Sequence, residues 1–495
     1  MEFSSVIFIE LFLPVLLVLY YLAGLIRKAE TKLKVQNALL LAASLLFYAW
    51  GGLWQLLLFA ALTVANFCLA ILIRRAQEAD KVGAAKGTAV FTVVFDAALL
   101  AFFKYFTIGG SVIARVRAGT GLGRVLLTQT ASAESTVIKL VMPLAFSFIT
   151  FQAIAYIADV YNKKTEPSRN LLEFGLFMSL FAQLTQGPIM RYGDLGPQFR
   201  DRTVTLKSFA GGAKRFCYGF GKKVLIANTL GAMADKIWGA EDISALGSGV
   251  AWLGILFYTL QIYYDFSGYT DMAIGTGAMF GFKISENFDY PYTSLSIQEF
   301  WRRWHISLSS WFRDYIYIPL GGNRRGKGRL FFNLFVVFFV TGIWHGANLN
   351  FILWGMLFAV LSIIERAFLG ELLKKNPVKP VNWLYATFAV MMGWVLFRAP
   401  SLAAAGQYYG QLFAFKASSQ GLTVLSYLNM EVLAAAIAGI LLCGFVQRPL
   451  AKVYEKVRDN TVFICVDTLV WLCILAWSIV QLVSGSYNPS IYGNF

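Results

Sequence analysis

Two histidines carry most of the chemical potential of this sequence. They are the only histidines among its 495 residues. His305 stands in a run crowded with Trp and Arg, and His345 closes the apolar run Leu330–Trp344. In a chain this apolar, an ionisable group at membrane depth indicates function. A neutral imidazole, with an ordinary pKa of about 6.5, takes a proton from an alcohol as a new bond forms.

Each histidine also has an ordinary structural interpretation. The Trp and Arg residues near His305 are typical of a membrane interface, and His345 alone fits an imidazole bonded to a backbone carbonyl in a helix bundle. A polar, small-residue break between two apolar runs surrounds His345 and favours chemistry there. This break contains Trp344, Gly346, Asn348 and Asn350.

The segment around His305 predicts one amphipathic helix at the membrane interface. At about 100° per residue, apolar and polar side chains fall on opposite faces, with His305 at their border. The apolar face holds Trp301, Trp304, Leu308, Trp311 and Tyr315, and the opposite face holds Arg302, Ser309 and Arg313. Pro319 and Gly321-Gly322 end this helix. Its Trp–Arg border would also suit a phosphopantetheine or nucleotide phosphate arriving from the cytoplasm.

The composition predicts an all-α, polytopic integral membrane protein. The chain is 58% hydrophobic and 14% charged, with a mean hydropathy of +0.60, whereas soluble proteins carry roughly a quarter charged residues. Its net charge of +16 lies in short loops, as the positive-inside rule predicts, so no nucleic-acid partner is expected. The five cysteines show no disulfide or metal-ligand spacing, and no metal site is predicted.

The apolar runs predict about eleven spanning or half-spanning helices of roughly 20 residues or fewer. Val6–Ile26 has no basic region before it and is expected as a retained helix. The later runs are Asn37–Trp50, Leu53–Ile73, Thr88–Ile108, Val137–Tyr161, Asn170–Gly187, Gly247–Phe266, Leu330–Trp344, Phe351–Ile364, Trp383–Phe397, Val432–Val446 and Thr461–Val483. Thr270–Phe282 is a short, Gly-rich segment. Phe209–Trp238 is expected as an interfacial amphipathic helix.

Breaks and charges within these runs add detail. Gly187 and Pro188 predict a half-helix or re-entrant segment. Asp96 and Lys104 predict that Thr88–Ile108 packs against protein, and Gly109–Thr136 is expected as a loop. The basic loops Arg27–Lys34, Arg74–Lys86 and Asn323–Arg329 are expected on the cytoplasmic side. Polar groups in Val137–Tyr161 are expected to face a bundle interior or wet cavity; they are Ser147, Thr150, Gln152 and Asp159.

Several stretches resemble the membrane-bound O-acyltransferases, and more narrowly the alginate O-acetyltransferase type of bacterial cell-envelope enzymes. They are Leu45–Gly51, Pro143–Tyr161, Gln183–Phe199, Gln261–Tyr292, Phe300–Gly322 and Thr341–Ala347. The pairing of WRRWHISLS with GIWHG is highly specific, and the resemblance covers nearly the whole chain. The closing YNPSIYGNF departs from it, because Gly493 stands where Phe or Tyr is usual.

The resemblance implies one membrane-embedded domain over residues 1–495, with its helices around a central cavity. The N-terminal helices would occupy 1–108, the motif core about 137–370, and the C-terminal helices 381–484. His345 would be catalytic and His305 a supporting motif histidine. The expected substrate-binding residues are Gln152, Asp265, Trp301, Arg302, Trp304, Ser309, Trp344 and Asn348.

The resemblance also implies a reaction and partners. An acetyl or other short acyl group would pass from a cytoplasmic thioester, acetyl-CoA or an acyl-carrier protein, to hydroxyls of an extracellular or cell-envelope polysaccharide. A separate extracytoplasmic SGNH or hydrolase-like acetyltransferase would complete the transfer. No bound cofactor is expected. The location would be the bacterial inner membrane, as a multi-pass protein.

Two alternatives stay open at this point. The related D-alanyl transfer proteins of teichoic acid modification share the WHISLS and WHG motifs, but are shorter. A polymer or lipid transporter is less favoured, although Asp265, Asp271 and the histidines would fit a proton relay, because the sequence lacks internal repeats. The residues do not decide whether His345 deprotonates the acceptor or carries the acyl group itself.

Overall fold

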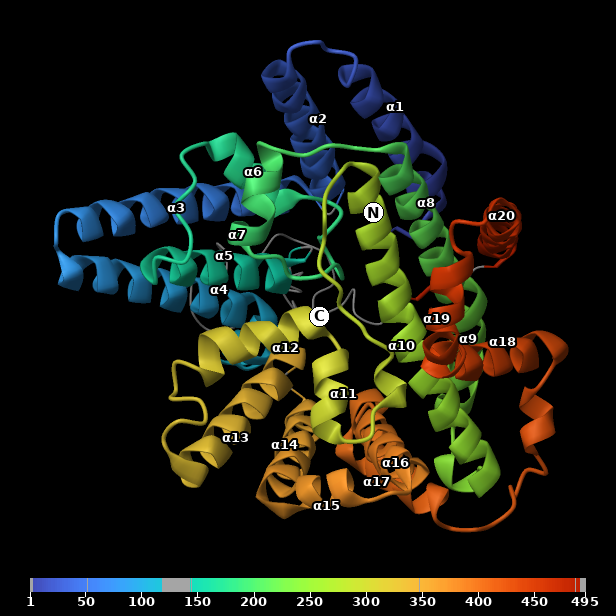
Figure 1. The fold of residues 1–495 in the computed structure, drawn as a ribbon. Helices are drawn as coiled ribbons and strands as arrows, with labels where there is room; N and C mark the ends of the chain where they lie inside the picture. Colours follow the sequence, from blue (N-terminus) through green and yellow to red (C-terminus); the bar gives the residue numbers. More distant parts are fainter. Residues whose placement is uncertain are drawn as a thin grey trace. The chain divides into compact units, whose positions relative to one another are not determined.

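The computed structural model describes residues 3–50, 52–117, 143, 145–346, 348–485 and 487–489. Within these ranges every regular element is a helix, which confirms the predicted all-α class (Figure 1). The chain divides into two compact units. The smaller unit contains Leu41–Leu184 and Arg191–Gly196, and the larger contains Met1–Leu40, Thr185–Met190 and Pro197–Phe495. The assignment of a single membrane domain stays a prediction.

The smaller unit is built on mutual packing of α3 (Leu53–Glu78), α4 (Val82–Arg117) and α5 (Phe146–Tyr161). Asp96 on α4 is buried, and its Oδ1 accepts a hydrogen bond from Asn66 Nδ2 at 3.3 Å. The predicted packing of this segment against protein is therefore confirmed.

Two further expectations concern this unit and the residues that follow it. The loop expected over Gly109–Thr136 is wrong at its start, because α4 continues to Arg117; its remainder lies outside the described residues, as do 137–142 of the run before α5. The helix break predicted at Gly187 and Pro188 comes earlier, because α6 (Leu171–Ser179) ends at Ser179 and irregular backbone follows. A half-helix or re-entrant segment here stays a prediction.

The larger unit is organised around α10 (Ser248–Met279), a largely buried helix of 32 residues. The sequence predicted two segments here, with a break near Ser267-Gly268, and this is wrong. Gly268 and Gly275 continue the helix because they face another backbone. A Cβ on Gly268 would lie 2.7 Å from the Gly219 carbonyl oxygen, and one on Gly275 would lie 2.5 Å from that of Gly212. These glycines are contact points between helices.

The partner of α10 is the continuous helical run of α8 (Leu206–Gly221), η4 (Lys222–Asn228) and α9 (Thr229–Trp238). Figure 1 shows α8 alongside α10. The sequence predicted an amphipathic helix lying at the membrane interface. Instead, the run buries one side along α10, and residues such as Phe220 and Leu230 have no exposed surface. Its alternation of polar and apolar residues reflects burial against protein.

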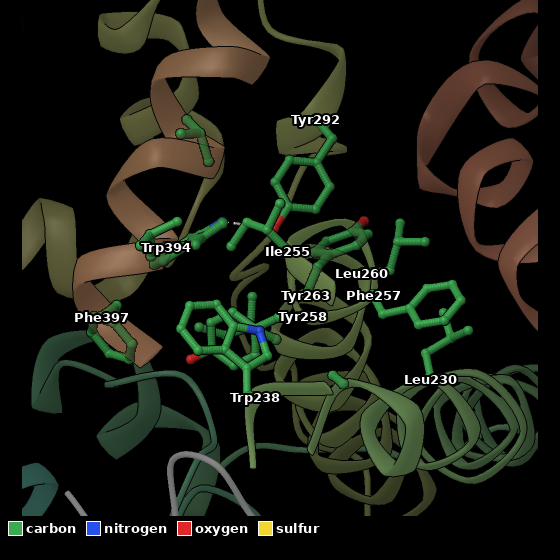
Figure 2. Close-up of a cluster of buried hydrophobic side chains, with 14 of the residues drawn as sticks. Leu230, Trp238, Ile255, Phe257, Tyr258, Leu260, Tyr263, Tyr292, Trp394 and Phe397 are labelled. Carbon is green, nitrogen blue, oxygen red and sulfur yellow. Dashed lines mark hydrogen bonds between the residues drawn. The ribbon is translucent and has the colours of Figure 1, made fainter. Parts of the chain in front are cut away.

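A core of large aromatic side chains joins α9 and α10 to α16 (Lys379–Arg398) and α17 (Leu402–Leu412). Figure 2 shows part of this cluster. Trp238 stacks on Tyr408 with ring centroids 3.7 Å apart. Tyr292 donates to the Thr259 carbonyl oxygen at 2.7 Å and accepts from Trp394 Nε1 at 3.1 Å. The packing is thus pinned by hydrogen bonds of the polar atoms that aromatic side chains bring inside.

Among the described residues, six helices are long and apolar enough to cross a membrane. A seventh is added if α18 with η10 (Met430–Phe445) and α19 (Gln447–Val457), bent by 72°, form one span. The six are Gln55–Glu78, Val82–Tyr105, Gly326–His345, Leu349–Lys375, Lys379–Arg398 and Thr461–Ser484. The chain is therefore a multi-pass membrane protein. The predicted number of about eleven also counts half-spanning pieces and stays a prediction.

Candidate active site

The segment around His305 is broken at the histidine. α11 (Ile297–Arg303) ends before Trp304, and α12 (Ile306–Phe312) begins after His305, followed by η7 (Arg313–Tyr317). His305 has a φ of 45°, in the left-handed region, which non-glycine residues rarely adopt. The prediction of one continuous amphipathic helix is therefore wrong, and the break falls on the residue of interest.

Asn287 explains the break. Its backbone carbonyl accepts from the Ile306 amide at 2.9 Å. Its side-chain Oδ1 accepts from the Ser307 amide at 3.0 Å and from Ser307 Oγ at 2.9 Å. These contacts satisfy amides at the start of α12 that have no partner within the helix. One asparagine thus caps the helix and holds the histidine in its unusual backbone conformation.

The same Asn287 Oδ1 lies 3.2 Å from His305 Nδ1. Because this oxygen already accepts the Ser307 amide, it acts as an acceptor toward the ring too. Nδ1 must then carry the proton, which leaves the lone pair on Nε2. Burial lowers the pKa of His305 to about 3, so the ring is neutral at ordinary pH. Phe266 contacts it edge to face, with centroids 4.7 Å apart.

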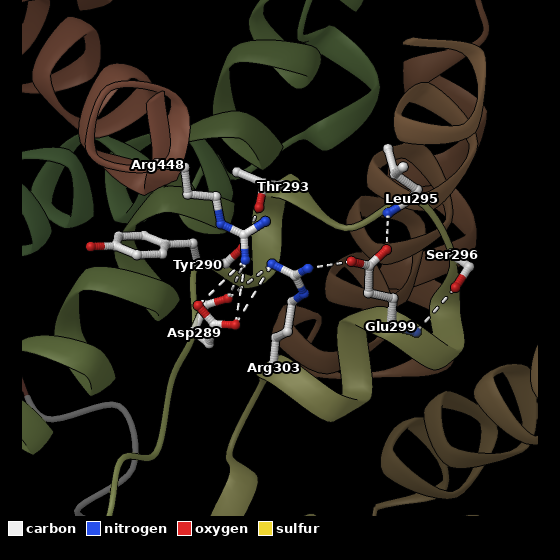
Figure 3. Close-up of polar contacts among 8 residues, drawn as sticks. All are labelled: Asp289, Tyr290, Thr293, Leu295, Ser296, Glu299, Arg303 and Arg448. Carbon is white, nitrogen blue, oxygen red and sulfur yellow. Dashed lines mark hydrogen bonds and ion pairs between the residues drawn. The ribbon is translucent and has the colours of Figure 1, made fainter. Parts of the chain in front are cut away.

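α11 is fixed at both ends by charged side chains. At its start, the buried Glu365 accepts from the Ile297 and Gln298 amides at 2.6 and 2.9 Å, where a carboxylate suits the helix dipole. At its end, Arg303 binds Glu299 and lies 3.8 Å from Asp289. Figure 3 shows this arginine between the two carboxylates. These contacts set the direction in which α11 presents Trp304 and His305.

His345 is the last residue of α13 (Gly326–His345), and α14 begins at Leu349. The two helices meet closely, because a Cβ on Gly342 would lie 2.6 Å from the Phe351 carbonyl oxygen. The turn between them is tied to the end of α16. Asn348 Nδ2 donates to the Pro400 carbonyl at 2.9 Å, and Asn350 Nδ2 donates to that of Ala399 at 2.7 Å. The polar break seen in the sequence therefore fixes this turn.

The imidazole of His345 is buried among aromatic rings. Its centroid lies 5.0 Å from that of Trp354 and 5.0 Å from that of Phe397, both edge to face. Trp344 lies beside it at 4.6 Å, and only 4% of the residue is exposed. Burial of this kind strengthens electrostatic interactions at the imidazole by excluding water.

The two histidines border one aromatic cluster. Trp304, next to His305, has its ring centroid 5.1 Å from that of Trp394. Trp394 in turn lies 5.6 Å from Phe397, which contacts His345. Both imidazoles therefore belong to one packed region of the larger unit, although they are distant in sequence.

The predicted substrate-binding residues lie in different surroundings, and only some of them join the aromatic region. Trp301, Trp304 and Trp344 join the aromatic region, with Trp301 5.6 Å from Trp354 between ring centroids. Ser309 donates to the Trp304 carbonyl at 3.4 Å. Arg302 is exposed.

The remaining predicted residues have other surroundings. Asn348 is exposed and caps the start of α14. Asp265 is 2% exposed and forms an ion pair with Lys223 at 2.5 Å. Lys223 Nζ also donates to the Pro489 carbonyl. Gln152 is buried in α5 of the smaller unit.

Sequence reasoning missed the residues that shape the site. Asn287 lies within a motif stretch but carries no signal of its own, because its partners are 18 and 20 positions away. Trp354, Trp394 and Phe397 were assigned only to apolar runs. One signal could have indicated a site. Trp usually gathers at the membrane interface, so a Trp inside an apolar run is unusual.

Comparisons with known proteins agree with this architecture. The model of the membrane-bound O-acyltransferase family matches residues 167–406. A probable alginate O-acetylase AlgI from Pseudomonas putida is 40% identical over the full length of both chains. A peptidoglycan O-acetyltransferase from Helicobacter pylori is 34% identical over 81% of this chain and 78% of its own. A teichoic acid D-alanyltransferase from Streptococcus thermophilus is 29% identical over 51% of this chain and 68% of its own.

The helical fold with its apolar spans defines a multi-pass membrane protein. The chain belongs to the membrane-bound O-acyltransferase family and is an O-acyltransferase similar to the alginate O-acetylases. Both histidines lie within the part of the chain that the family model matches.

Proposed function

We propose that this enzyme moves an acetyl or other short acyl group from a cytoplasmic thioester across the membrane, with His345 as the general base, and that a separate extracytoplasmic hydrolase-like protein places the group on hydroxyls of a polysaccharide. The main support for this proposal is the burial of His345 at the end of an apolar helix, among aromatic side chains. The relatives that are alginate O-acetylases and a peptidoglycan O-acetyltransferase support the polysaccharide acceptor. The location would be the bacterial inner membrane.

In the proposed step, His345 accepts the proton of the acceptor hydroxyl as the hydroxyl oxygen attacks the thioester carbonyl. The carbon–sulfur bond then breaks, the ester forms, and the proton from the imidazolium neutralises the departing thiolate. Acetyl-CoA or an acyl-carrier protein would supply the thioester. His305, fixed by Asn287, acts as a positioning residue across the shared aromatic cluster.

Transfer of D-alanyl groups is the second candidate. The teichoic acid D-alanyltransferase relative supports it, but that match spans only 51% of this chain. The alginate O-acetylase match spans all of it, so O-acetyl transfer is favoured.

Substitution of the proposed base tests this function. We expect His345→Ala to lower acyl transfer by about 100-fold or more, the usual scale for loss of a general base. Ester-linked acetate on the envelope polysaccharide, measured in cells without another O-acetylase, reports the activity. Lys374→Ala, an exposed change outside the site, serves as a control for expression and insertion. Near-normal acetylation with His345→Ala would remove His345 as the base, and released D-alanine in place of acetate would favour the second candidate.

A further inference from the structure

A large cavity opens in the larger unit, apart from both histidines. Its volume is about 1340 Å³, and it lies between α8, α10 and the outer helices α18, α19 and α20. Neither His305 nor His345 lines it. We refer to it as the outer groove.

The outer groove has an apolar wall. Six of the side chains that form it are Leu225, Ala434, Ala438, Leu442, Ile474 and Trp477. Leu442 is 40% exposed and Trp477 59% exposed. The flanking helix α20 (Thr461–Ser484) is an apolar candidate span with only 6% of its central residues buried, which suits a helix that faces bilayer lipid. An apolar groove bordered by such a helix is accessible to acyl chains.

One end of the outer groove carries both basic and acidic side chains. Lys214 forms an ion pair with Asp467 at 2.6 Å, and Lys222 with Asp271 at 2.6 Å. An ammonium group has three donors, so each lysine keeps donors for a further acceptor. Their side chains are partly exposed in the groove.

The negative partners at this end include Glu286 and Asp289. Both line the groove, and more than half of each side chain is exposed. Arg215 is already engaged by Asp271 and Glu286, at 2.8 and 2.5 Å. The groove end therefore offers ammonium donors and exposed carboxylates together, a combination that does not favour a purely anionic ligand.

Aromatic residues place this charged end at the level of lipid headgroups. Lys214 Nζ lies 5.8 Å from the ring centroid of Tyr218 and 5.4 Å from that of Tyr454, and both tyrosines line the groove. Tyrosine and lysine gather where the hydrocarbon region meets water, and long basic side chains reach from apolar surroundings to that level.

We propose that the outer groove binds a zwitterionic aminophospholipid of the bilayer. Its acyl chains lie along the apolar wall, its phosphate accepts from Lys214 and Lys222, and its ammonium group contacts Glu286 and Asp289. The lipid is a bound component of the protein, and its site is separate from the acyl-transfer site.

Native mass spectrometry of the full chain tests this proposal. The protein is released from bilayer discs that contain equal amounts of phosphatidylethanolamine and phosphatidylglycerol. We expect one retained phosphatidylethanolamine, at least about tenfold more occupied than phosphatidylglycerol. Lys214→Ala with Lys222→Ala should reduce retention about tenfold, whereas Lys374→Ala, an exposed control outside the groove, should not.

Two milder variants keep the result decisive if the double lysine change disturbs folding. Ala438→Trp fills the apolar wall without altering charge and should also remove the lipid. Glu286→Gln should keep lipid binding but abolish the preference for phosphatidylethanolamine. Equal retention of both lipids by the unaltered chain, or undiminished retention with Ala438→Trp, would overturn the proposal.

Discussion

At His305 a side-chain amide replaces the hydrogen bonding of a continuous helix. Asn287 binds the backbone on the far side of the break and the histidine ring with one oxygen. The strained φ of 45° is maintained because three donors converge on that oxygen. Strain held in this way is typical of functional sites.

The burial of His305 predicts a pH effect on stability. Its pKa is about 3 in the folded protein and about 6.5 when unfolded. Between these values the unfolded chain binds more protons, so the free energy of unfolding falls as the pH drops, by ~1.4 kcal/mol per pH unit. His305→Asn does not titrate, and its amide can still donate to Asn287. We expect its melting temperature in detergent to fall less than that of the unaltered protein between about pH 6.5 and pH 4.

The matched control for this measurement is Arg302→Gln, which changes an exposed neighbour and should keep the steeper pH dependence. Equal acid sensitivity of His305→Asn and the unaltered protein would show that the His305 ring is not held neutral by burial.

At the scale of elements, the contact between α8 and α10 depends on paired glycines. A Cβ at Gly219 would lie 2.6 Å from the Gly268 carbonyl oxygen, whereas a Cβ at Gly211 on the same helix meets nothing within 4 Å. The helices therefore touch backbone to backbone on one side only.

This contrast gives a paired test by substitution. Gly219→Ala should separate the helices and cost about 1–3 kcal/mol, the usual effect of overpacking. Gly211→Ala should be neutral or stabilise by up to about 1 kcal/mol, because alanine is the better helix former. Thermal unfolding in detergent measures both. A Gly219→Ala protein as stable as Gly211→Ala would contradict the close contact.

The same elements show what could be predicted from the sequence. Hydropathy and charge identified the helical class and the packed span with Asp96, because these depend on local composition. The breaks were predicted poorly. From the sequence alone, Gly268 predicts a helix break, whereas in the fold it continues the helix and packs against Gly219. His305 is predicted within a helix, whereas its contacts with Asn287 accompany a break there. Both outcomes depend on contacts between distant segments, which periodicity does not contain.

At the scale of the whole molecule, the described residues form helices and short connections. The segment Ala399–Glu431, between two of the apolar runs, contains α17, whose Tyr408 stacks within the core on Trp238. That segment is therefore part of the core, not a cleft for a polymer. This observation supports the proposal that a separate extracytoplasmic hydrolase-like protein places the acyl group on the polysaccharide.

Reconstitution tests this division of labour. The purified chain is placed in liposomes with the acetyl thioester inside and the polysaccharide outside. We expect little ester-linked acetate on the polymer until the extracytoplasmic partner is added, and none with His345→Ala in either case. Efficient acetylation by the chain alone would make it the complete transferase.

The buried pair of Lys223 and Asp265 bears on the order of assembly during synthesis. Its third partner, the Pro489 carbonyl, is translated after more than two hundred further residues, which takes roughly 10–45 s at bacterial and eukaryotic elongation rates. Nearby, Asn488 binds both Asn228 and Ser4, which joins a residue near the start of the described chain to one near its end. Until residues 487–489 are synthesised, therefore, Lys223 can form its ion pair with Asp265 but lacks the hydrogen bond to the Pro489 carbonyl. These contacts within the larger unit form only after residues 487–489 have left the ribosome, so they are among the late steps of its folding.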